Sequence, residues 1–245
     1  MIEAGAPFEI FDEIDSTVLE ARRRADFGDY GPVWMIARRQ TAGRGRRGRK
    51  WASPEGNLYA TYLGRTTRAP AEIALLGFAA GVAIVETIEA MGIEGAQLKW
   101  PNDVFIKGAK ASGILLDSGA IEGGAHWFAL AFGVNIVSSP SGIDQETTSL
   151  MDHGAVLAPK ALLREIAPRI AAWAASLERA GFAALRKAWL SRAYRLGEPI
   201  RVVVGEETVS GRMSGLSAHG ELEIETPAGV RAISAGDIHF QQAAH

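Results

Sequence analysis

Short apolar runs with strand character alternate along the first two-thirds of the chain with longer segments in which apolar residues recur every three or four positions. The short runs predict strands at 8–11, 33–37, 58–63, 104–106 and 111–116, and a reversal at Gly123-Gly124 within 121–127. The longer segments predict helices from about Thr17, over 70–92, over 159–180 and over 182–194. This mixture predicts an α+β fold, in which helices pack on a mixed β-sheet.

Two local signals refine these elements. Thr17 and Glu20 have the spacing of a capping box, which would begin the first helix at Thr17. Residues 138–153 are rich in Ser, Thr, Gly and Asp, so we expect a surface loop there.

The pattern changes after Gly197. Four or five short strands follow one another without a helix and are separated by glycine-containing turns. About 45 residues of this kind are typical of a small β-barrel. We therefore expect two domains, 1–196 and 197–245, with the boundary at Leu196-Gly197.

Composition limits the possible classes of function. The chain has 245 residues and a net charge of −2, so the protein as a whole does not attract polyanions. It has no cysteine, which excludes disulfides, thiolate metal sites and a cysteine nucleophile, and which fits a reducing cytoplasm. The N-terminus lacks the pattern of a secretion signal, and the most apolar stretch, 73–88, is interrupted by Gly and Glu and is too short to span a bilayer. We expect a soluble cytoplasmic protein with no membrane span.

The segment 38–51 holds seven basic side chains, three glycines and no acid. Glycines let the backbone approach a ligand closely, and guanidinium groups bind phosphate oxygens in pairs. A solvated basic loop or a nucleic-acid-binding patch would have a similar composition. Two observations favour a nucleotide site: Trp51 and a strand follow at once, and the rest of the chain is net acidic.

Two further motifs carry polar residues next to predicted strands. In Lys99-Trp100-Pro101-Asn102-Asp103, a turn stiffened by proline can fix an amide and a carboxylate, although an ordinary Asn-Asp turn would look the same. Lys110 precedes an apolar strand, so its ammonium must reach an anion or solvent. An exposed lysine in a hairpin is the alternative explanation.

Taken together and in this order, these motifs resemble the biotin protein ligases of the biotin/lipoate ligase superfamily. The resemblance covers nearly the whole chain, and it implies an SH3-like barrel for the C-terminal segment. The motifs that carry it are Asp15-Ser16-Thr17, the stretch 43–51, the stretch 99–103, Lys110 with Gly113-Ile114-Leu115, and Gly133-Val134-Asn135.

The resemblance implies an enzyme that activates biotin with ATP and transfers it to a lysine of a biotin carboxyl carrier protein. Catalytic roles fall to Lys110, Asp103 and Arg46. The implied biotin-binding residues are Ser16, Thr17, Val18, Gln40, Arg44, Gly45, Arg46 and Lys110. The implied ATP- and phosphate-binding residues are Arg47, Arg49, Lys50, Trp51, Asn102 and Asn135. Mg²⁺ is expected, with Asp103 as one residue near it.

The resemblance also sets expectations about state and partners. Residues 44–49 should be mobile without ligand and ordered with it, and a homodimer is possible. Since the catalytic segment begins within about ten residues of Met1, we expect no operator binding. Val18, Ala131 and Asp117 stand where many members have Asn, Gly and Glu, and none of these changes removes a charge that the mechanism needs. A lipoate ligase, a nucleic-acid-binding module and a biotin sensor without catalysis are the alternatives.

Overall fold

A seven-stranded mixed sheet forms the centre of the larger part of the molecule, and a computed structural model describes residues 2–142 and 145–240. Its strand order is β1-β2-β3-β7-β6-β5-β4, with β1 parallel to β2 and every other neighbouring pair antiparallel. The strands are β1 (Phe8–Ile14), β2 (Val33–Gln40), β3 (Leu58–Thr66), β4 (Ala96–Lys99), β5 (Asp103–Ile106), β6 (Ala109–Ile121) and β7 (Ala125–Val134). Every strand predicted from the apolar runs is present, most of them longer than expected.

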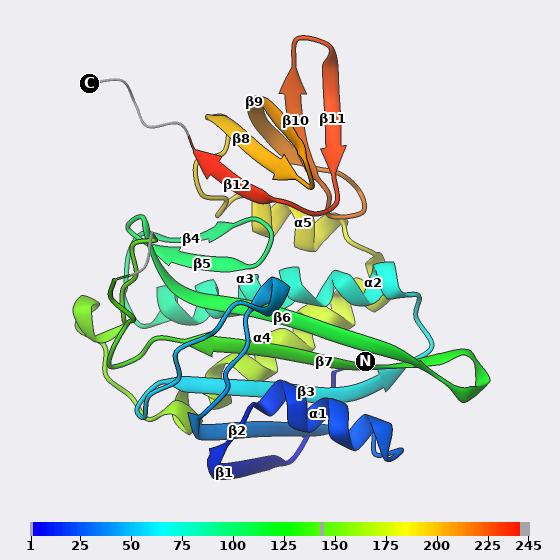
Figure 1. Cartoon of the computed structure of the whole chain (residues 1–245), viewed down its shortest axis with the longest axis vertical. Coiled ribbons are helices and arrows are strands. Elements are labelled where there is room, and N and C mark those ends of the chain that lie inside the picture. The colour runs from blue at the N-terminus through cyan, green and yellow to red at the C-terminus, as the bar shows by residue number, and fades with distance from the viewer. Residues whose placement is uncertain (1, 143–144, 241–245) are drawn as a thin grey trace.

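Helices cover both faces of this sheet. Helices α3 (Leu76–Ala90) and α4 (Pro159–Ala180) lie behind it, with α2 (Pro70–Ala74) next to α3, and α1 (Thr17–Asp26) lies in front (Figure 1). Helix α5 (Ala183–Leu190) packs on α3 and α4 beyond the edge of the sheet. The apolar side chains of α3 and α4 pack against large residues of the sheet, among them Trp34, Tyr62 and Phe128. The prediction of helices packed on a mixed sheet is confirmed.

The helix predicted over 70–92 is divided at Leu75 into α2 and α3. Residues 70–90 together are long and apolar enough to cross a membrane, so the length argument did not exclude a span. Its burial instead indicates a core helix, because 72% of the most apolar part lies inside the protein. Glu86, one of three acids in this segment, accepts a hydrogen bond from Trp173 Nε1 of α4 at 3.1 Å.

The predicted capping box at Thr17 is wrong. Ser16 occupies the position before the first helical residue, and its side chain makes no capping bond. Glu20 is unavailable for a box because its carboxylate is bonded to Arg23 and Arg24. Its amide instead continues the helix by bonding to Ser16 O at 3.0 Å.

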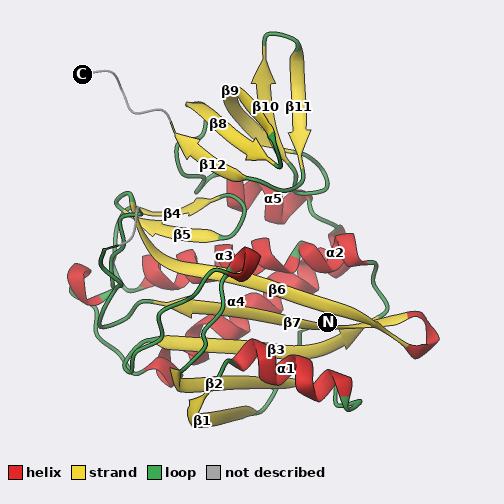
Figure 2. Cartoon of the chain, in the orientation of Figure 1, coloured by secondary structure: helices red, strands yellow, loops and turns green. Residues whose placement is uncertain are grey.

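The C-terminal part is a separate antiparallel sheet, seen above the larger sheet in Figure 2. Its strands are β8 (Pro199–Val204), β9 (Glu207–Leu216), β10 (Leu222–Thr226), β11 (Gly229–Ile233) and β12 (Asp237–Phe240), in the order β11-β10-β9-β8-β12. The predicted run of strands without a helix is confirmed. Within the described residues, however, no ladder joins β11 to β12, because β12 pairs with β8 alone, so the barrel is not closed.

Candidate functional site

A β-bulge in β6 brings the two central charged residues to one face of the sheet. Asp103 of β5 pairs with Gly113, and Phe105 pairs with Lys110, so one extra residue of β6 lies between these pairs. Such an extra residue re-aims the side chains on one side of it. As a result Lys110 Nζ lies 2.7 Å from Asp103 Oδ1, and both side chains are more than four-fifths buried. The two predicted catalytic residues therefore form an ion pair, not an exposed hairpin lysine beside an ordinary turn.

The turn before β5 connects this ion pair to the arginine-glycine loop. Asn102 exchanges two hydrogen bonds with Ile114 of β6, through its own side-chain amide and its backbone carbonyl. Its remaining side-chain oxygen accepts a bond from Arg46 Nη1 at 3.1 Å. Arg46 belongs to the short helical turn η1 (Arg46–Gly48) of the loop. Asn102 thus holds a predicted catalytic arginine close to the Lys110–Asp103 pair.

Trp51 lies flat on a floor made by two glycines. A Cβ atom on Gly133 would come within 2.6 Å of the indole nitrogen, and one on Gly113 within 2.9 Å of the ring. Lys110 Nζ is 5.4 Å from the centre of the same ring, a distance at which cation and ring attract. The structure places the Trp51 ring as an apolar wall beside Lys110, and its predicted place among the phosphate-binding residues stays a prediction.

The start of α1 provides the other, uncharged end of the site. Gln40 Oε1 accepts bonds from Thr17 N and Thr17 Oγ1, and Gln40 Nε2 donates to Ser53 Oγ. Thr61 Oγ1, buried on β3, donates to Thr17 Oγ1 at 2.7 Å. Ser16 Oγ is buried and has no hydrogen-bond partner, which leaves it free to bond a ligand. Ser16, Thr17 and Gln40, predicted to bind the same part of biotin, therefore lie together.

Thr61 and Ser53 were not among the predicted site residues. The signal for Thr61 was a lone polar residue within the apolar run 58–63, which suggests a buried hydroxyl with a specific partner. Nothing in the local sequence pointed to Ser53, because its side-chain partner Gln40 belongs to an earlier strand, although Ser53 also donates to the nearby carbonyl of Trp51.

An ion pair fixes the loop that presents Ser16. Asp15 accepts two bonds from Arg23 of α1, at 2.7 and 2.9 Å, and a third from Ser16 N. The bond from Arg23 lowers the pKa of the Asp15 carboxyl. The backbone carbonyl of Asp15 also accepts a hydrogen bond from Ala42 N, so Asp15 links α1 to the beginning of the basic loop.

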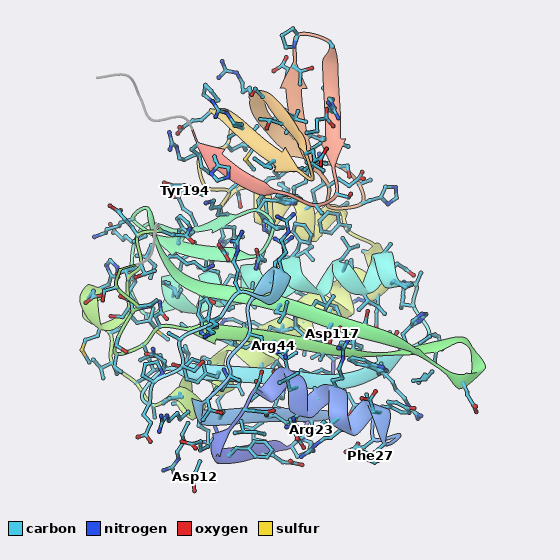
Figure 3. The ribbon with its side chains drawn as sticks, in the orientation of Figure 1. Asp12, Arg23, Phe27, Arg44, Asp117 and Tyr194 are labelled. Carbon is cyan, nitrogen blue, oxygen red and sulfur yellow. The ribbon has the colours of Figure 1, made fainter. Side chains whose placement is uncertain are left out.

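A cavity of about 210 Å³ opens between α1, the basic loop and β6. Val18, Arg44, Gly45 and Asp117 are among the residues that line it, and Arg44 and Asp117 point to the same side of the sheet in Figure 3. An Arg22–Asp117 ion pair of 3.4 Å spans from α1 to β6 at this cavity. The predicted biotin-binding residues Val18, Arg44 and Gly45 thus meet at one hollow beside Ser16 and Thr17.

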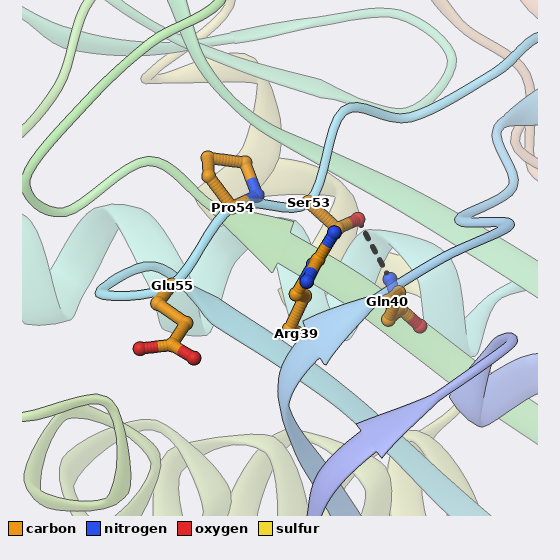
Figure 4. A pocket seen from close by; sticks show the side chains of 5 residues that line it. All are labelled: Arg39, Gln40, Ser53, Pro54 and Glu55. Carbon is orange, nitrogen blue, oxygen red and sulfur yellow. Dashed lines mark hydrogen bonds between the residues drawn. The ribbon is translucent and has the colours of Figure 1, made fainter.

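A second hollow, of about 490 Å³, lies on the outer side of Gln40. Arg39, Ser53, Pro54 and Glu55 line it, and the Gln40–Ser53 hydrogen bond crosses its inner wall (Figure 4). Gln40 therefore separates this outer hollow from Thr17 and the start of α1.

The remaining predicted phosphate-binding residues do not all face the site. Arg47, Arg49 and Lys50 are exposed on the loop, as a phosphate clamp requires. Asn135, by contrast, is buried, and its amide donates to the carbonyls of Thr148 at 3.0 Å and Lys110 at 3.5 Å. These bonds let Asn135 fix the backbone at Lys110, and its predicted contact with ATP stays a prediction.

The residues present fit Mg²⁺ only as an ion that a phosphate substrate brings with it. Asp103 offers one carboxylate, and the described residues contain no group of three or more His, Cys, Asp or Glu side chains that could hold a metal. Mg²⁺ commonly uses one or two carboxylates and completes its shell with phosphate oxygens and water.

These features define a site for a ligand with a neutral polar head and an anionic end. Comparisons with known proteins agree with it. Residues 13–135 match the model of the biotin/lipoate A/B protein ligase family, and residues 196–240 match that of the biotin protein ligase C terminal domain. The chain belongs to the biotin/lipoate A/B protein ligase family.

Two relatives and one solved structure are similar over nearly their whole length. A biotin–[acetyl-CoA-carboxylase] ligase from Paracoccus denitrificans is 38% identical over 92% of this chain and 97% of that relative. The ligase of the same name from Mycobacterium tuberculosis is 32% identical over 97% of this chain and 91% of its own. The biotin protein ligase from Aquifex aeolicus, solved with biotin and ATP, superposes with a TM-score of 0.80 at 28% identity, covering 97% and 99% of the two chains.

Proposed function

We propose that this protein converts biotin and ATP into biotinyl-5′-AMP and then transfers the biotinyl group to a lysine of a biotin carboxyl carrier protein. One observation carries the proposal: the ion pair of Lys110 and Asp103 lies on the sheet face whose other end holds the Ser16, Thr17 and Gln40 cluster. The names of the relatives, and the biotin and ATP bound in the Aquifex structure, support it.

The neutral end suits the ureido ring of biotin. The free hydroxyl of Ser16 can donate to its carbonyl oxygen or accept from its N–H groups, and Thr17 and Gln40 are already oriented by their mutual bonds. The apolar side chains Val18 and Leu115 at the cavity, with the Trp51 ring beside Lys110, suit the sulfur-containing ring and the aliphatic tail. Biotin in this orientation directs its carboxylate toward Lys110.

In the first step, a biotin carboxylate oxygen attacks the α-phosphorus of ATP, and pyrophosphate leaves. Two anions must approach each other, so fixed positive charge at the junction lowers the barrier. Lys110 supplies that charge and Asp103 holds it in place, while Asn102 holds Arg46 close by. The exposed Arg47, Arg49 and Lys50 receive the departing phosphates when the loop closes. Mg²⁺ bound to the phosphates, with Asp103 as a protein ligand, would neutralise part of their charge.

In the second step, the amine of the carrier lysine attacks the biotinyl carbonyl, and AMP leaves. The Asp103 carboxylate, beside Lys110, accepts a hydrogen bond from the attacking amine and so orients it. Closure of residues 44–49 over the adenylate would protect the mixed anhydride from water. The name of the Paracoccus relative favours the carrier of acetyl-CoA carboxylase as the substrate protein.

We also propose the domain boundary at Leu196-Gly197, just before the second sheet begins at Pro199. A cytoplasmic location fits a chain without cysteine whose substrates are ATP and a carboxylase subunit. A homodimer and the absence of operator binding stay predictions.

The deciding experiment follows biotin-dependent release of pyrophosphate from MgATP, and the mass gained by an acceptor carrier domain. Lys110→Ala should slow both by about 100-fold or more, because a fixed charge at the reacting atoms is lost. Lys187→Ala, on the exposed surface of α5, is the matched control and should change neither. Lipoate in place of biotin should give no release. An unmodified acceptor and no biotin-dependent pyrophosphate from the wild-type protein would refute the proposal.

A further inference from the structure

Trp100 lies in the turn between β4 and β5 and is almost completely buried, with 3% of its surface exposed. Its indole Nε1 donates a hydrogen bond of 3.1 Å to the carbonyl oxygen of Gly220, 120 residues further along the chain. Gly220 belongs to the turn between β9 and β10. This buried bond therefore joins the turn that carries Asn102 and Asp103 to the C-terminal sheet.

The carbonyl of Gly220 has little freedom to move. Gly220 has φ +81°, where other residues are strained, and a Cβ atom there would lie 2.8 Å from Phe78 and 3.2 Å from Leu75. Its amide is bonded to Ser217 O, and the Ser217 hydroxyl accepts the amides of His219 and Glu221. The acceptor of the Trp100 bond is thus held on one side by α3 and on the other by its own turn.

A second contact links the C-terminal sheet to the same turn. Lys99 Nζ lies 5.1 Å from the centre of the Phe105 ring and 5.8 Å from that of Phe240, which belongs to β12. Tyr194 packs between these two rings, at 5.0 Å from Phe105 and 5.2 Å from Phe240. Two consecutive residues, Lys99 and Trp100, therefore contact the C-terminal sheet directly before the residues that serve the site.

The other side of the turn is fixed by the large sheet. Asn102 is bonded twice to Ile114, and Asp103 is paired with Lys110. The cluster at Ser16, Thr17 and Gln40 is instead held by the start of α1 and by β2 and β3. A shift of Trp100 would therefore change the geometry at Asn102 and Asp103 and leave the biotin head group's partners in place.

We propose that Trp100 is a positioning residue for adenylation, and that it uses the Gly220 carbonyl of the C-terminal sheet as a fixed support for the turn 100–103. The proposal rests on the function proposed above. Its effect falls on the chemical step, since Asn102 and Asp103 orient Arg46 and Lys110 around the reacting phosphate.

The test compares two Trp→Phe variants. Trp100→Phe removes the donor and leaves the buried Gly220 carbonyl without a partner, so the turn is expected to relax. Trp173→Phe is the matched control, because it also removes one indole hydrogen bond, to Glu86, but far from the site. Biotin-dependent pyrophosphate release is measured per folded molecule. For Trp100→Phe, kcat should fall about tenfold while KM for biotin stays within twofold. For Trp173→Phe, both should stay within twofold.

A second variant moves the same support without altering Trp100. Gly220→Ala forces the turn away from Phe78 and Leu75, and it should reproduce the fall in kcat at an unchanged KM for biotin. It also decides the question if Trp100→Phe does not fold. An unchanged kcat, or a KM that changes as much as kcat, would overturn the positioning role. Failure of the wild-type protein to release pyrophosphate would instead refute the function itself.

Discussion

The two faces of the seven-stranded sheet are built from the same strands but filled in opposite ways. Behind the sheet, Trp34, Tyr62, Phe128 and Phe132 are buried and in contact, with Trp34 5.1 Å from Tyr62 and 5.9 Å from Phe132 between ring centres. In front, the central strands β6 and β7 present Gly113 and Gly133 beneath the Trp51 ring. Large side chains stabilise the first face, whereas the small residues on the second face leave room for ligands.

The contrast is sharpest within three consecutive residues of β7. Phe132 points to the core behind the sheet, whereas its neighbours Ala131 and Gly133 point to the site. A strand alternates its side chains between faces, so neighbouring positions can serve stability and function separately. This separation can be tested position by position.

The largest effect is expected from Phe132→Ala on the core face. Loss of a buried aromatic ring should lower the free energy of unfolding by about 3–5 kcal/mol, measured by denaturant titration. Activity per folded molecule should change by no more than about twofold, since no site residue loses a contact. A loss of activity beyond the loss of folded protein would show that the faces are not independent.

Gly133→Ala should have the reverse effect. The added methyl group would meet the Trp51 ring at 2.6 Å and push it toward Lys110, so pyrophosphate release should fall about 100-fold. The free energy of unfolding should change by only about 1–2 kcal/mol, because removing a flexible glycine partly offsets the crowding.

Gly119→Ala, further along β6, provides the control for Gly133→Ala. A Cβ atom there would crowd Trp127, with its indole nitrogen 2.5 Å away, but outside the site. This variant should keep wild-type activity. Equal activities for the two glycine variants would contradict the proposed floor.

Two buried serines without hydrogen-bond partners allow a finer comparison. Ser112 and Ser16 are both buried, and neither hydroxyl is bonded to the protein. Replacing either with alanine should raise the free energy of unfolding by about 1 kcal/mol, because an unsatisfied polar group is removed. Only Ser16→Ala should weaken biotin binding, by about tenfold in calorimetry. Unaltered binding in Ser16→Ala would contradict the assignment of Ser16 to the biotin site. Weakened binding in Ser112→Ala would contradict the expected difference between the two serines.

The smallest effect concerns the rim of the site and depends on pH. The bond from Arg23 lowers the pKa of Asp15, so the charged carboxylate stabilises the folded state above its unfolded pKa of about 3.9. That contribution is lost as pH falls through the lowered folded value. Because Asp15 is largely solvated, Asp15→Asn should cost only a few tenths of a kcal/mol at pH 7, and the difference should vanish in acid.

Urea titrations between pH 7 and pH 3 measure this difference. Asp12→Asn is the control, because the Asp12 side chain is 89% exposed and its bond to Arg38 is longer, at 3.3 Å. At pH 7 it should change the free energy of unfolding by less than Asp15→Asn does. A difference between wild type and Asp15→Asn that grows in acid would refute the assignment.

Much of this arrangement could be predicted from the sequence. Apolar periodicity indicated the strands and the main helices, since burial imposes period two or period 3.6 on the residues themselves. The motifs indicated Lys110, Asp103, Ser16, Thr17 and Gln40, and the structure brings them to one side of the sheet.

One prediction failed because neighbouring side chains compete for the same carboxylate, and two other residues have partners far along the chain. Glu20 could have closed a capping box, but Arg23 and Arg24 engage it instead. Trp51 follows a row of arginines in the sequence, yet its ring lies on glycines about 60 and 80 residues away. Asn135, predicted to bind ATP, donates its side-chain amide to the loop that carries Thr148, and its contact with ATP stays a prediction. No local pattern contains the partners of Trp51 and Asn135.

The bulge in β6 changes how the spacing of the motif should be understood. Lys110 and Gly113 are three positions apart, an odd interval that would place them on opposite faces of a regular strand. They nevertheless meet the same Trp51 ring because one residue between them is unpaired. The spacing of Lys110 and Gly113 in the motif therefore includes one bulged residue, which turns the Lys110 side chain to the same face as Gly113. Deleting Ala111 would leave every catalytic residue type in the chain while turning the lysine toward the hydrophobic core.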